Sequence, residues 1–129
     1  MVGRDRRRVS DDTCLFCRIV AGTEPSDTVA SNELVIAFRD KYPRAPVHVL
    51  VVTREHVDSF HALDDDDLET LVAVTQLARE VAETEGIADA YRLATNIGAG
   101  GGQAIPHLHF HVLGGRQLLH IDSGEPPRS

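Results

Sequence analysis

The stretch that decides the fold is Pro106-His107-Leu108-His109-Phe110-His111-Val112-Leu113-Gly114-Gly115-Arg116. Its three histidines alternate with Leu108, Phe110 and Val112. Because successive side chains of an extended strand point to opposite faces, this pattern predicts a strand with an apolar face for the core and a face of imidazoles roughly 7 Å apart. Neutral imidazole can act near pH 7 as a nucleophile, a general base or a metal ligand. The histidine face is therefore a candidate functional surface.

The composition is typical of one soluble globular domain. The chain has 129 residues, of which 42% are hydrophobic and 26% charged, and this length is sufficient for one core. A formal net charge of −7 argues against nonspecific binding to a nucleic-acid backbone. No apolar run is long enough to span a membrane, and no apolar segment follows the basic N-terminus as in a secretory signal. We therefore expect a cytoplasmic protein that binds neither nucleic acid nor a membrane.

The two ends of the chain differ in pattern from its middle. Residues 1–11 are polar and lack periodicity, which predicts a disordered tail. Pro126 and Pro127 predict an irregular tail over residues 120–129. Since the sequence shows no internal repeat, we expect residues 12–119 to form the single domain.

Apolar and β-branched runs predict about five mostly antiparallel strands. They cover residues 28–30, 34–38, 48–53, 91–96 and the histidine stretch. One short and one long helix complete the pattern. The predicted class is α+β.

Capping residues mark the ends of the two helices. The short helix is expected to begin near Cys14, with Asp12 or Thr13 as its N-cap and Gly22 at its end. The long helix is expected after the acidic run 64–67, because carboxylates suit the positive end of a helix dipole. Apolar residues recur there at helical spacing, at Leu68, Leu71, Val72, Val74, Leu77, Ala78 and Val81.

A glycine-rich loop, Gly98-Ala99-Gly100-Gly101-Gly102-Gln103, leads directly into the histidine stretch. Glycines let the backbone approach an anion closely, and free amides there form an anion-binding concavity. A phosphate in this loop would lie against the imidazoles. A neutral histidine could then attack phosphorus and form a phosphohistidine, which water would hydrolyse. The alternative is a trio of surface or metal-binding histidines that catalyses no reaction.

Two cysteines, Cys14 and Cys17, have the two-residue spacing common in structural zinc sites. In a cytosolic protein such a pair favours metal binding or redox chemistry over a structural disulfide. Two further ligands must come from elsewhere, and His56 and His107 lie after a central strand and at the start of the histidine stretch. The alternative is a reduced, partly buried pair of thiols.

Several motifs together resemble the histidine-triad (HIT) family of nucleotidyl hydrolases and transferases. The segment from His107 to Leu113 is similar to the family signature, and Cys14-Leu15-Phe16-Cys17 is similar to its opening cysteine motif. Two further segments resemble the nucleoside-pocket region of the family, namely Ala37-Phe38-Arg39-Asp40 and Ala45-Pro46-Val47-His48. The continuation Val112-Leu113-Gly114-Gly115-Arg116 is more similar to the Hint branch, the purine nucleoside phosphoramidases, than to the dinucleoside-polyphosphate hydrolases.

The resemblance implies a role for each matching residue. His109 would be the nucleophile, His111 would contact the phosphoryl oxygens, and His107 and His48 would complete the catalytic set. The remaining implied roles are ribose binding by Asp40, base contact by Phe38, phosphate binding by Asn96 and the backbone of Gly102, Gln103 and Ala104, and structural zinc (Zn) binding by Cys14, Cys17, His56 and His107. The resemblance also implies a HIT-like fold and a homodimer whose sheets join into one.

The implied function is hydrolysis of purine nucleoside 5′-phosphoramidates, or related nucleotidyl conjugates, through a covalent nucleotidyl-histidine. Three positions depart from the family pattern. Ala104 replaces a common serine near the leaving group, Lys41 replaces an often apolar residue near the base, and residues 117–120 lack the usual tryptophan.

Three alternatives remain at this stage. The chain could be a zinc-stabilised nucleotide-binding or scaffold protein with little catalysis, a dinucleoside polyphosphate hydrolase, or a protein with a catalytic metal at His109. If the histidines divide their roles as implied, substitution of His109 should damage the chemistry, whereas substitution of His107 should damage stability.

Overall fold

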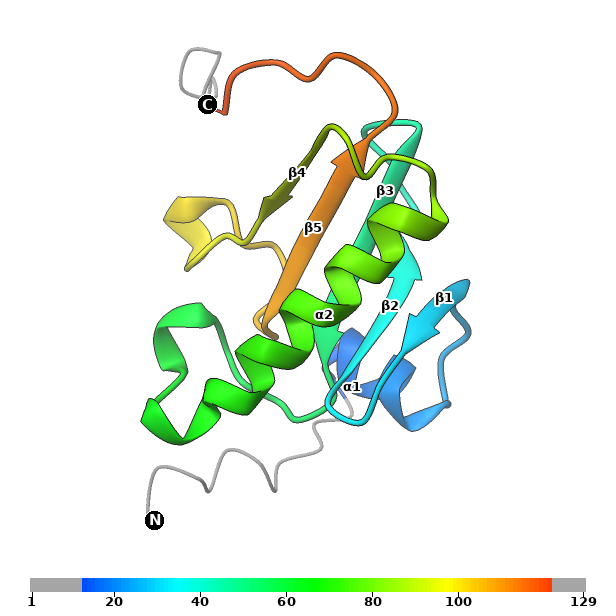
Figure 1. Ribbon diagram of the computed structural model, residues 1–129. Helices are drawn as coiled ribbons and strands as arrows, with labels where there is room; N and C mark the ends of the chain where they lie inside the picture. The colour runs from blue at the N-terminus through cyan, green and yellow to red at the C-terminus, as the bar shows by residue number, and fades with distance from the viewer. Residues whose placement is uncertain (1–12, 122–129) are drawn as a thin grey trace.

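The computed structural model describes residues 13–121, which form a five-stranded antiparallel sheet with two α-helices (Figure 1). The sheet has the order β1-β2-β3-β5-β4, and each neighbouring pair is antiparallel. The elements are α1 (Leu15–Ala21), β1 (Thr28–Ser31), β2 (Val35–Arg39), β3 (Val47–Thr53), α2 (Leu68–Thr84), β4 (Tyr91–Ala94), β5 (His109–Gly114) and the short 3₁₀ turns η2 (Phe60–Ala62), η3 (Asp65–Asp67) and η4 (Ala99–Gly101). The expected α+β class is confirmed.

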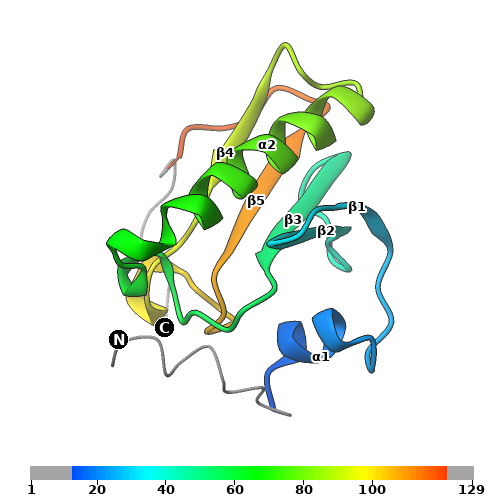
Figure 2. The ribbon, with the colours of Figure 1, turned by 60° about the horizontal axis from the view of Figure 1, so that its bottom comes forward.

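The two α-helices lie on opposite faces of the sheet (Figure 2). Alternate residues of the central strand β3 belong to different buried clusters. Val49 and Val51 pack in the cluster that contains α2, whereas Leu50 and Val52 pack in the cluster that contains α1. Since strand side chains alternate between faces, one apolar strand can supply both clusters.

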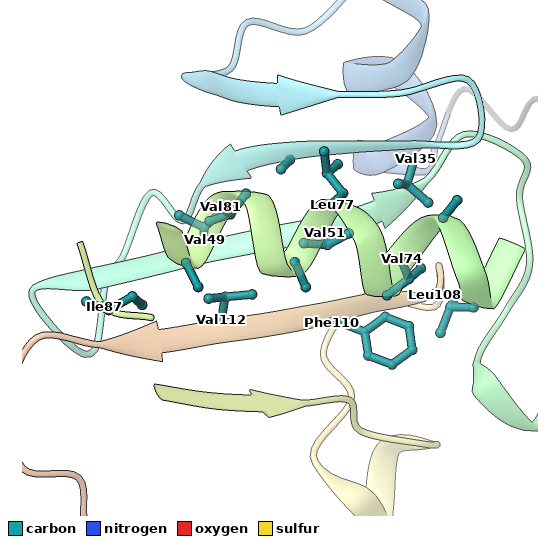
Figure 3. Packing of buried hydrophobic residues seen from close by; sticks show 14 of the residues in the cluster. Val35, Val49, Val51, Val74, Leu77, Val81, Ile87, Leu108, Phe110 and Val112 are labelled. Atoms are coloured by element: carbon teal, nitrogen blue, oxygen red, sulfur yellow. The ribbon is translucent and has the colours of Figure 1, made fainter. Parts of the chain in front are cut away.

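Helix α2 covers one face of the sheet along its length (Figure 3). Its buried side recurs at helical spacing, at Ala73, Val74, Leu77, Ala78, Val81 and Ala82. Leu68 and Val72 share the spacing expected from the sequence, but they are 62% and 55% exposed. The buried stripe of the helix is therefore narrower at its start than the sequence predicted.

The acidic run caps the 3₁₀ turn η3, which leads directly into α2. Asp64 and Asp67 form a capping box, in which the side chain of each residue accepts a hydrogen bond from the backbone amide of the other. Asp67 is buried, and its Oδ2 accepts from the Asp64 amide at 2.9 Å. These bonds satisfy amides that the first turn of a helix leaves without partners.

Helix α1 begins differently from the expectation. Its N-cap is Cys14, whose sulfur accepts a hydrogen bond from the Cys17 amide at 3.2 Å. Gly22 ends the helix at a φ of 82°, a left-handed conformation that favours glycine. The alternative cap Asp12, the expected tail 1–11 and most of the expected tail 120–129 lie outside the described residues. Within residues 13–121, no helix is long and apolar enough to cross a membrane.

The histidine stretch is a strand only from His109 onward. Strand β5 lies between β3 and β4, and Leu108, Phe110 and Val112 point into the core beneath α2 (Figure 3). The rings of His107 and His109 contact Phe16 of α1 on the other face. The predicted separation of apolar and histidine faces is confirmed, and His107 lies just before the strand.

Candidate active site and metal centre

His109, the first residue of β5, has the geometry that a neutral nucleophile would need. It is 7% exposed, and its Nδ1 lies 2.7 Å from the backbone oxygen of His107. A carbonyl oxygen can only accept, so Nδ1 carries the proton and Nε2 holds a lone pair. Burial lowers the pKa of His109 against the opposing effect of this hydrogen bond. The ring is therefore neutral near pH 7.

Phe16 of α1 restrains the ring of His109. The two rings meet edge to face, with centroids 5.0 Å apart and an interplanar angle of 82°. On the strand itself, Thr95 Oγ1 donates to the backbone oxygen of His109 at 2.7 Å. The sequence did not predict that Phe16 and Thr95 contact His109. The only indication for Phe16 was its position between the two cysteines of the opening motif.

His111 and His48 form a hydrogen-bonded pair next to His109. His48 Nε2 lies 2.9 Å from His111 Nδ1, and the rings of His109 and His111 have centroids 5.1 Å apart. In the β3–β5 register, His111 pairs with Leu50 and His48 pairs with Leu113. The two histidines are thus diagonal neighbours on one face, a distance that long or ring-shaped side chains can bridge.

Burial keeps these two rings neutral as well. It is the largest cause that lowers the pKa of His48, against the raising effect of the Asp40 carboxylate. Burial, reinforced by the neighbouring His109 and His48, lowers the pKa of His111 to about 4. Neutral rings can each donate from one nitrogen and accept at the other.

Asp40 follows β2 and lies beside the pair. Its Oδ2 is 3.3 Å from His48 Nε2, and its Oδ1 accepts from the Tyr42 amide at 2.9 Å. Phe38 lies on β2, is 4% exposed and meets Phe16 edge to face at 5.6 Å. The ribose and base contacts implied for Asp40 and Phe38 remain predictions.

The glycine-rich loop is held by the side chain of Gln103. Gln103 Oε1 accepts from the Gly98 amide at 2.8 Å, while its Nε2 donates to the backbone oxygens of Asp58 and Ile105 at 2.6 and 3.0 Å. Asn96 Nδ2 donates to the Gly102 backbone oxygen at 3.4 Å. The side chains of Gln103 and Asn96 therefore shape the loop.

Two of the three amides predicted to hold phosphate are already engaged. The Gly102 and Gln103 amides donate to the backbone oxygens of Ala99 and Gly98, each at 3.0 Å. For the Ala104 amide, no hydrogen bond is found within residues 13–121. Phosphate binding by all three amides would require the loop to share or open two bonds.

Cys14, Cys17, His56 and His107 come together as a possible metal centre. Their ligand atoms all lie within 4.8 Å of one another. His107 Nδ1 is 3.3 Å from the Cys14 sulfur and 3.5 Å from the Cys17 sulfur, and His56 Nδ1 is 3.2 Å from the Cys17 sulfur. A tetrahedral zinc ion with bonds of about 2.0 to 2.3 Å separates nitrogen and sulfur ligands by about 3.5 Å. The arrangement fits zinc.

In both histidines of this cluster, the ring nitrogen that faces away from the cysteines has an oxygen acceptor, as is usual for histidines that bind a metal. His107 Nε2 donates to the Thr53 backbone oxygen at 2.7 Å, and His56 Nε2 lies 2.9 Å from Asp58 Oδ1. These acceptors fix the proton on Nε2 and leave Nδ1 free to bind a metal. Burial lowers the pKa of His107 to about 4, so its ring is in the neutral form that ligates. Neither Thr53 nor Asp58 was predicted from the sequence.

Asp40, His48 and His111 form a second cluster of potential ligands, but its geometry fits hydrogen bonding better. The 2.9 Å between His48 Nε2 and His111 Nδ1 is shorter than the roughly 3.3 Å between two nitrogens on one tetrahedral ion. His109 belongs to neither cluster of the described residues. The geometry therefore does not favour a catalytic metal at His109.

Comparison with known proteins identifies the family of the chain. The family model described as the HIT domain matches residues 21–118. The purine nucleoside phosphoramidase of Escherichia coli (strain K12) is 39% identical over 105 residues, which cover 81% of this chain and 88% of that protein. The 14 kDa zinc-binding protein of Zea mays is 36% identical over 114 residues, which cover 87% and 89% of the two chains.

A solved structure extends the similarity to the fold. The HIT family hydrolase from Legionella pneumophila Philadelphia 1 superposes with a TM-score of 0.82 at 39% identity, covering 86% of this chain and 99% of that one. The family match, the relatives and the solved structure all point to one family. The chain belongs to the HIT-domain family.

Proposed function

We propose that this protein hydrolyses purine nucleoside 5′-phosphoramidates or related nucleotidyl conjugates, with His109 as the nucleophile. The observation that carries the proposal is the 2.7 Å contact between His109 Nδ1 and the His107 backbone oxygen, which leaves the lone pair on Nε2. The 39% identity to the phosphoramidase of Escherichia coli supports this class of substrate.

The reaction would proceed in two displacements at the α-phosphorus. First, His109 Nε2 bonds to phosphorus while the bond from phosphorus to the leaving nitrogen breaks. The electron pair stays on that nitrogen, which takes a proton from water, because Ala104 has no hydroxyl to offer one and the neutral ring of His111 keeps its proton. Water then attacks phosphorus and gives up a proton to the solvent, while the bond to His109 breaks and its electron pair returns to Nε2. The nucleoside monophosphate then leaves.

The surrounding residues would stabilise the charges that develop. Attack by Nε2 makes the His109 ring positive, and the His107 backbone oxygen already accepts from its Nδ1. His111 would donate to the phosphoryl oxygens, where negative charge accumulates. Asp40, Phe38, Asn96 and the loop backbone at Gly102, Gln103 and Ala104 would bind the nucleotide.

We assign a structural zinc ion to Cys14, Cys17, His56 and His107. These four residues join α1 to the segments after β3 and before β5. The ion would cross-link these segments and supply folding free energy, with no part in the reaction. The similarity to the zinc-binding protein of Zea mays supports this assignment.

The test of the nucleophile is turnover of adenosine and guanosine 5′-phosphoramidates by the wild type and His109→Ala. Loss of turnover in the variant, with a nucleotidyl adduct on the wild type seen by mass spectrometry of the denatured protein, is the expected result. His61→Ala, at an exposed histidine, serves as the control. Undiminished turnover by His109→Ala would disprove the assignment.

A second candidate is a zinc-stabilised nucleotide-binding protein with little catalysis, which Ala104 in the loop favours. Tight binding of AMP or GMP without turnover of phosphoramidates, acyl-adenylates or dinucleoside polyphosphates would identify it. Turnover of dinucleoside polyphosphates alone would identify the third candidate, a hydrolase of those compounds.

We also propose that the protein is a homodimer whose sheets join into one. Light scattering coupled to size-exclusion chromatography should give twice the chain mass. A monomer at all concentrations tested would contradict this assembly.

A further inference from the structure

We propose that Gly114-Gly115-Arg116 is a positioning motif that holds the backbone of Arg44 against His48 and thereby fixes the tautomers of His48 and His111. The inference deepens the proposed function. Its kinetic test rests on that function, whereas its NMR test does not. His48, Arg44 and Arg116 act through His111 and are positioning residues.

The Arg44 amide decides which nitrogen of His48 carries the proton. This N–H donates to His48 Nδ1 at 3.1 Å, so Nδ1 holds a lone pair and the neutral ring carries its proton on Nε2. The opposite tautomer would place an N–H of His48 against the N–H of Arg44, and two donors cannot bond to each other.

The tautomer of His48 then sets that of His111. His48 Nε2 lies 2.9 Å from His111 Nδ1 and 3.3 Å from Asp40 Oδ2. The proton on His48 Nε2 is donated over the shorter contact, so His111 accepts at Nδ1 and keeps its own proton on Nε2. His111 therefore offers an N–H donor, which suits the charged oxygens of a phosphoryl group.

Arg116 holds the residue that starts this chain of bonds. Its Nη2 donates to the Arg44 backbone oxygen at 2.7 Å, and its Nη1 donates to the Gln117 backbone oxygen at 2.9 Å. Both backbone polar groups of Arg44 are thus bonded, the carbonyl to Arg116 and the amide to His48. The exposed loop between β2 and β3 is thereby tied to the end of β5.

The two glycines allow the end of β5 to approach this closely. Gly115 has a φ of 96°, and a Cβ there would lie 2.9 Å from Pro46 Cβ. A Cβ on Gly114 would lie 2.9 Å from Ile87 Cδ1 and 3.3 Å from the Ala90 backbone oxygen. A side chain at Gly115 would therefore be strained and would push the strand end, and Arg116 with it, away from Pro46, whereas a side chain at Gly114 would require Ile87 or the strand end to shift.

The test is ¹⁵N NMR of the histidine rings in the wild type, Arg116→Ala and Arg116→Lys. In the wild type, the lone-pair type of nitrogen is expected at Nδ1 of both His48 and His111, with the protonated type at Nε2. In Arg116→Ala, we expect the His48 signals to move toward the average of two tautomers. We expect kcat to fall about tenfold, as for loss of one positioned hydrogen bond, with KM changed less than about twofold. Arg116→Lys should recover part of both effects.

Two matched variants separate positioning from general damage. Arg92→Ala also removes an arginine that donates to a backbone oxygen, that of Leu119, and should leave the His48 spectrum unchanged. Gly86→Ala introduces a side chain at a φ of 77° with nothing within 4 Å, so it matches the strain of Gly115→Ala without the clash with Pro46. Of these two glycine variants, only Gly115→Ala should change the His48 spectrum.

The spectra decide the inference independently of the proposed reaction. A proton on His48 Nδ1 in the wild type would overturn the tautomer assignment. An unchanged His48 spectrum in Arg116→Ala would overturn the role of Arg116. If the spectra behave as expected and no phosphoramidate is hydrolysed, the positioning motif stands and the proposed substrate class fails.

Discussion

Removing the ring of His107 should cost more stability than removing the ring of His56, the other histidine of the candidate metal centre. The ring is fully buried, and its Nε2 donates to the Thr53 backbone oxygen at 2.7 Å. In His107→Ala that oxygen loses its ring donor, at a cost of about 1 to 3 kcal/mol. The volume left by the ring costs about 2 kcal/mol more. Without zinc, we expect the free energy of unfolding to fall by about 3 to 5 kcal/mol, against a usual total of about 5 to 15 kcal/mol.

His56→Ala is the matched variant, because it removes a candidate ligand whose ring is less deeply buried than that of His107. The His56 side chain is 14% exposed, and its Nε2 partner, Asp58, is 76% exposed. Without zinc, this variant should lose only about 1 kcal/mol, the usual contribution of one partly exposed hydrogen bond. Each variant lacks one of four ligands, so the stabilisation that zinc gives by binding the folded state should nearly vanish in both.

The assay is urea unfolding of the wild type, both variants and His61→Ala, each in chelator and in buffered zinc. Low temperature keeps His107→Ala folded, and metal analysis of each sample checks its occupancy. An equal gain from zinc in the wild type and in His56→Ala would refute the ligand assignment. A zinc-free loss no greater for His107→Ala than for His56→Ala would refute the packing argument.

Three further predictions concern pH and the start of α2. Burial lowers the pKa of His109 below 6.5. The value of kcat/KM should therefore stay level as the pH falls through 6.5 and decline only at lower pH. A midpoint of this decline at or above pH 6.5 would contradict the prediction. Because the pKa of His111 is about 4 in the folded chain and 6.5 in the unfolded one, the unfolded chain binds more protons between these values, so stability is full above pH 6.5 and falls toward pH 4. His111→Gln should therefore flatten the pH dependence of the urea midpoint. Asp67→Ala should cost about 1 to 2 kcal/mol by thermal unfolding, whereas Glu69→Ala, at an exposed position, should cost little.

Local patterns predicted the elements whose form depends on local geometry. The alternation in the histidine stretch predicted that Phe110 and Val112 would face the core and the histidines the other side. This prediction needs only local geometry, because successive side chains of any strand point to opposite faces. Gly22 ended α1 as expected, because a left-handed residue is needed there. The spacing in α2 predicted a buried face, but not that Leu68 would be exposed, since spacing does not tell how far a sheet extends beneath a helix.

The contacts that shape the site join residues distant in sequence, and this is why the sequence missed them. His107 and Thr53 are 54 residues apart, and Arg116 and Arg44 are 72 apart. In each pair, one partner contributes a backbone oxygen, which every residue type carries. A motif of side chains therefore gives no indication of these acceptors, and only the register of β3 against β5 brings them into place.

His107 connects the metal centre to the nucleophile through two parts of one residue. Its ring faces the cysteines, while its backbone oxygen accepts from His109 Nδ1. The ring has a second anchor in the Thr53 backbone oxygen, and this bond requires no metal. Loss of zinc alone should therefore leave the His107 backbone close to its place, whereas loss of the ring removes both anchors. The place of His107 just before β5, where its ring can turn to the cysteines, would let one histidine serve the fold while the next serves the proposed reaction.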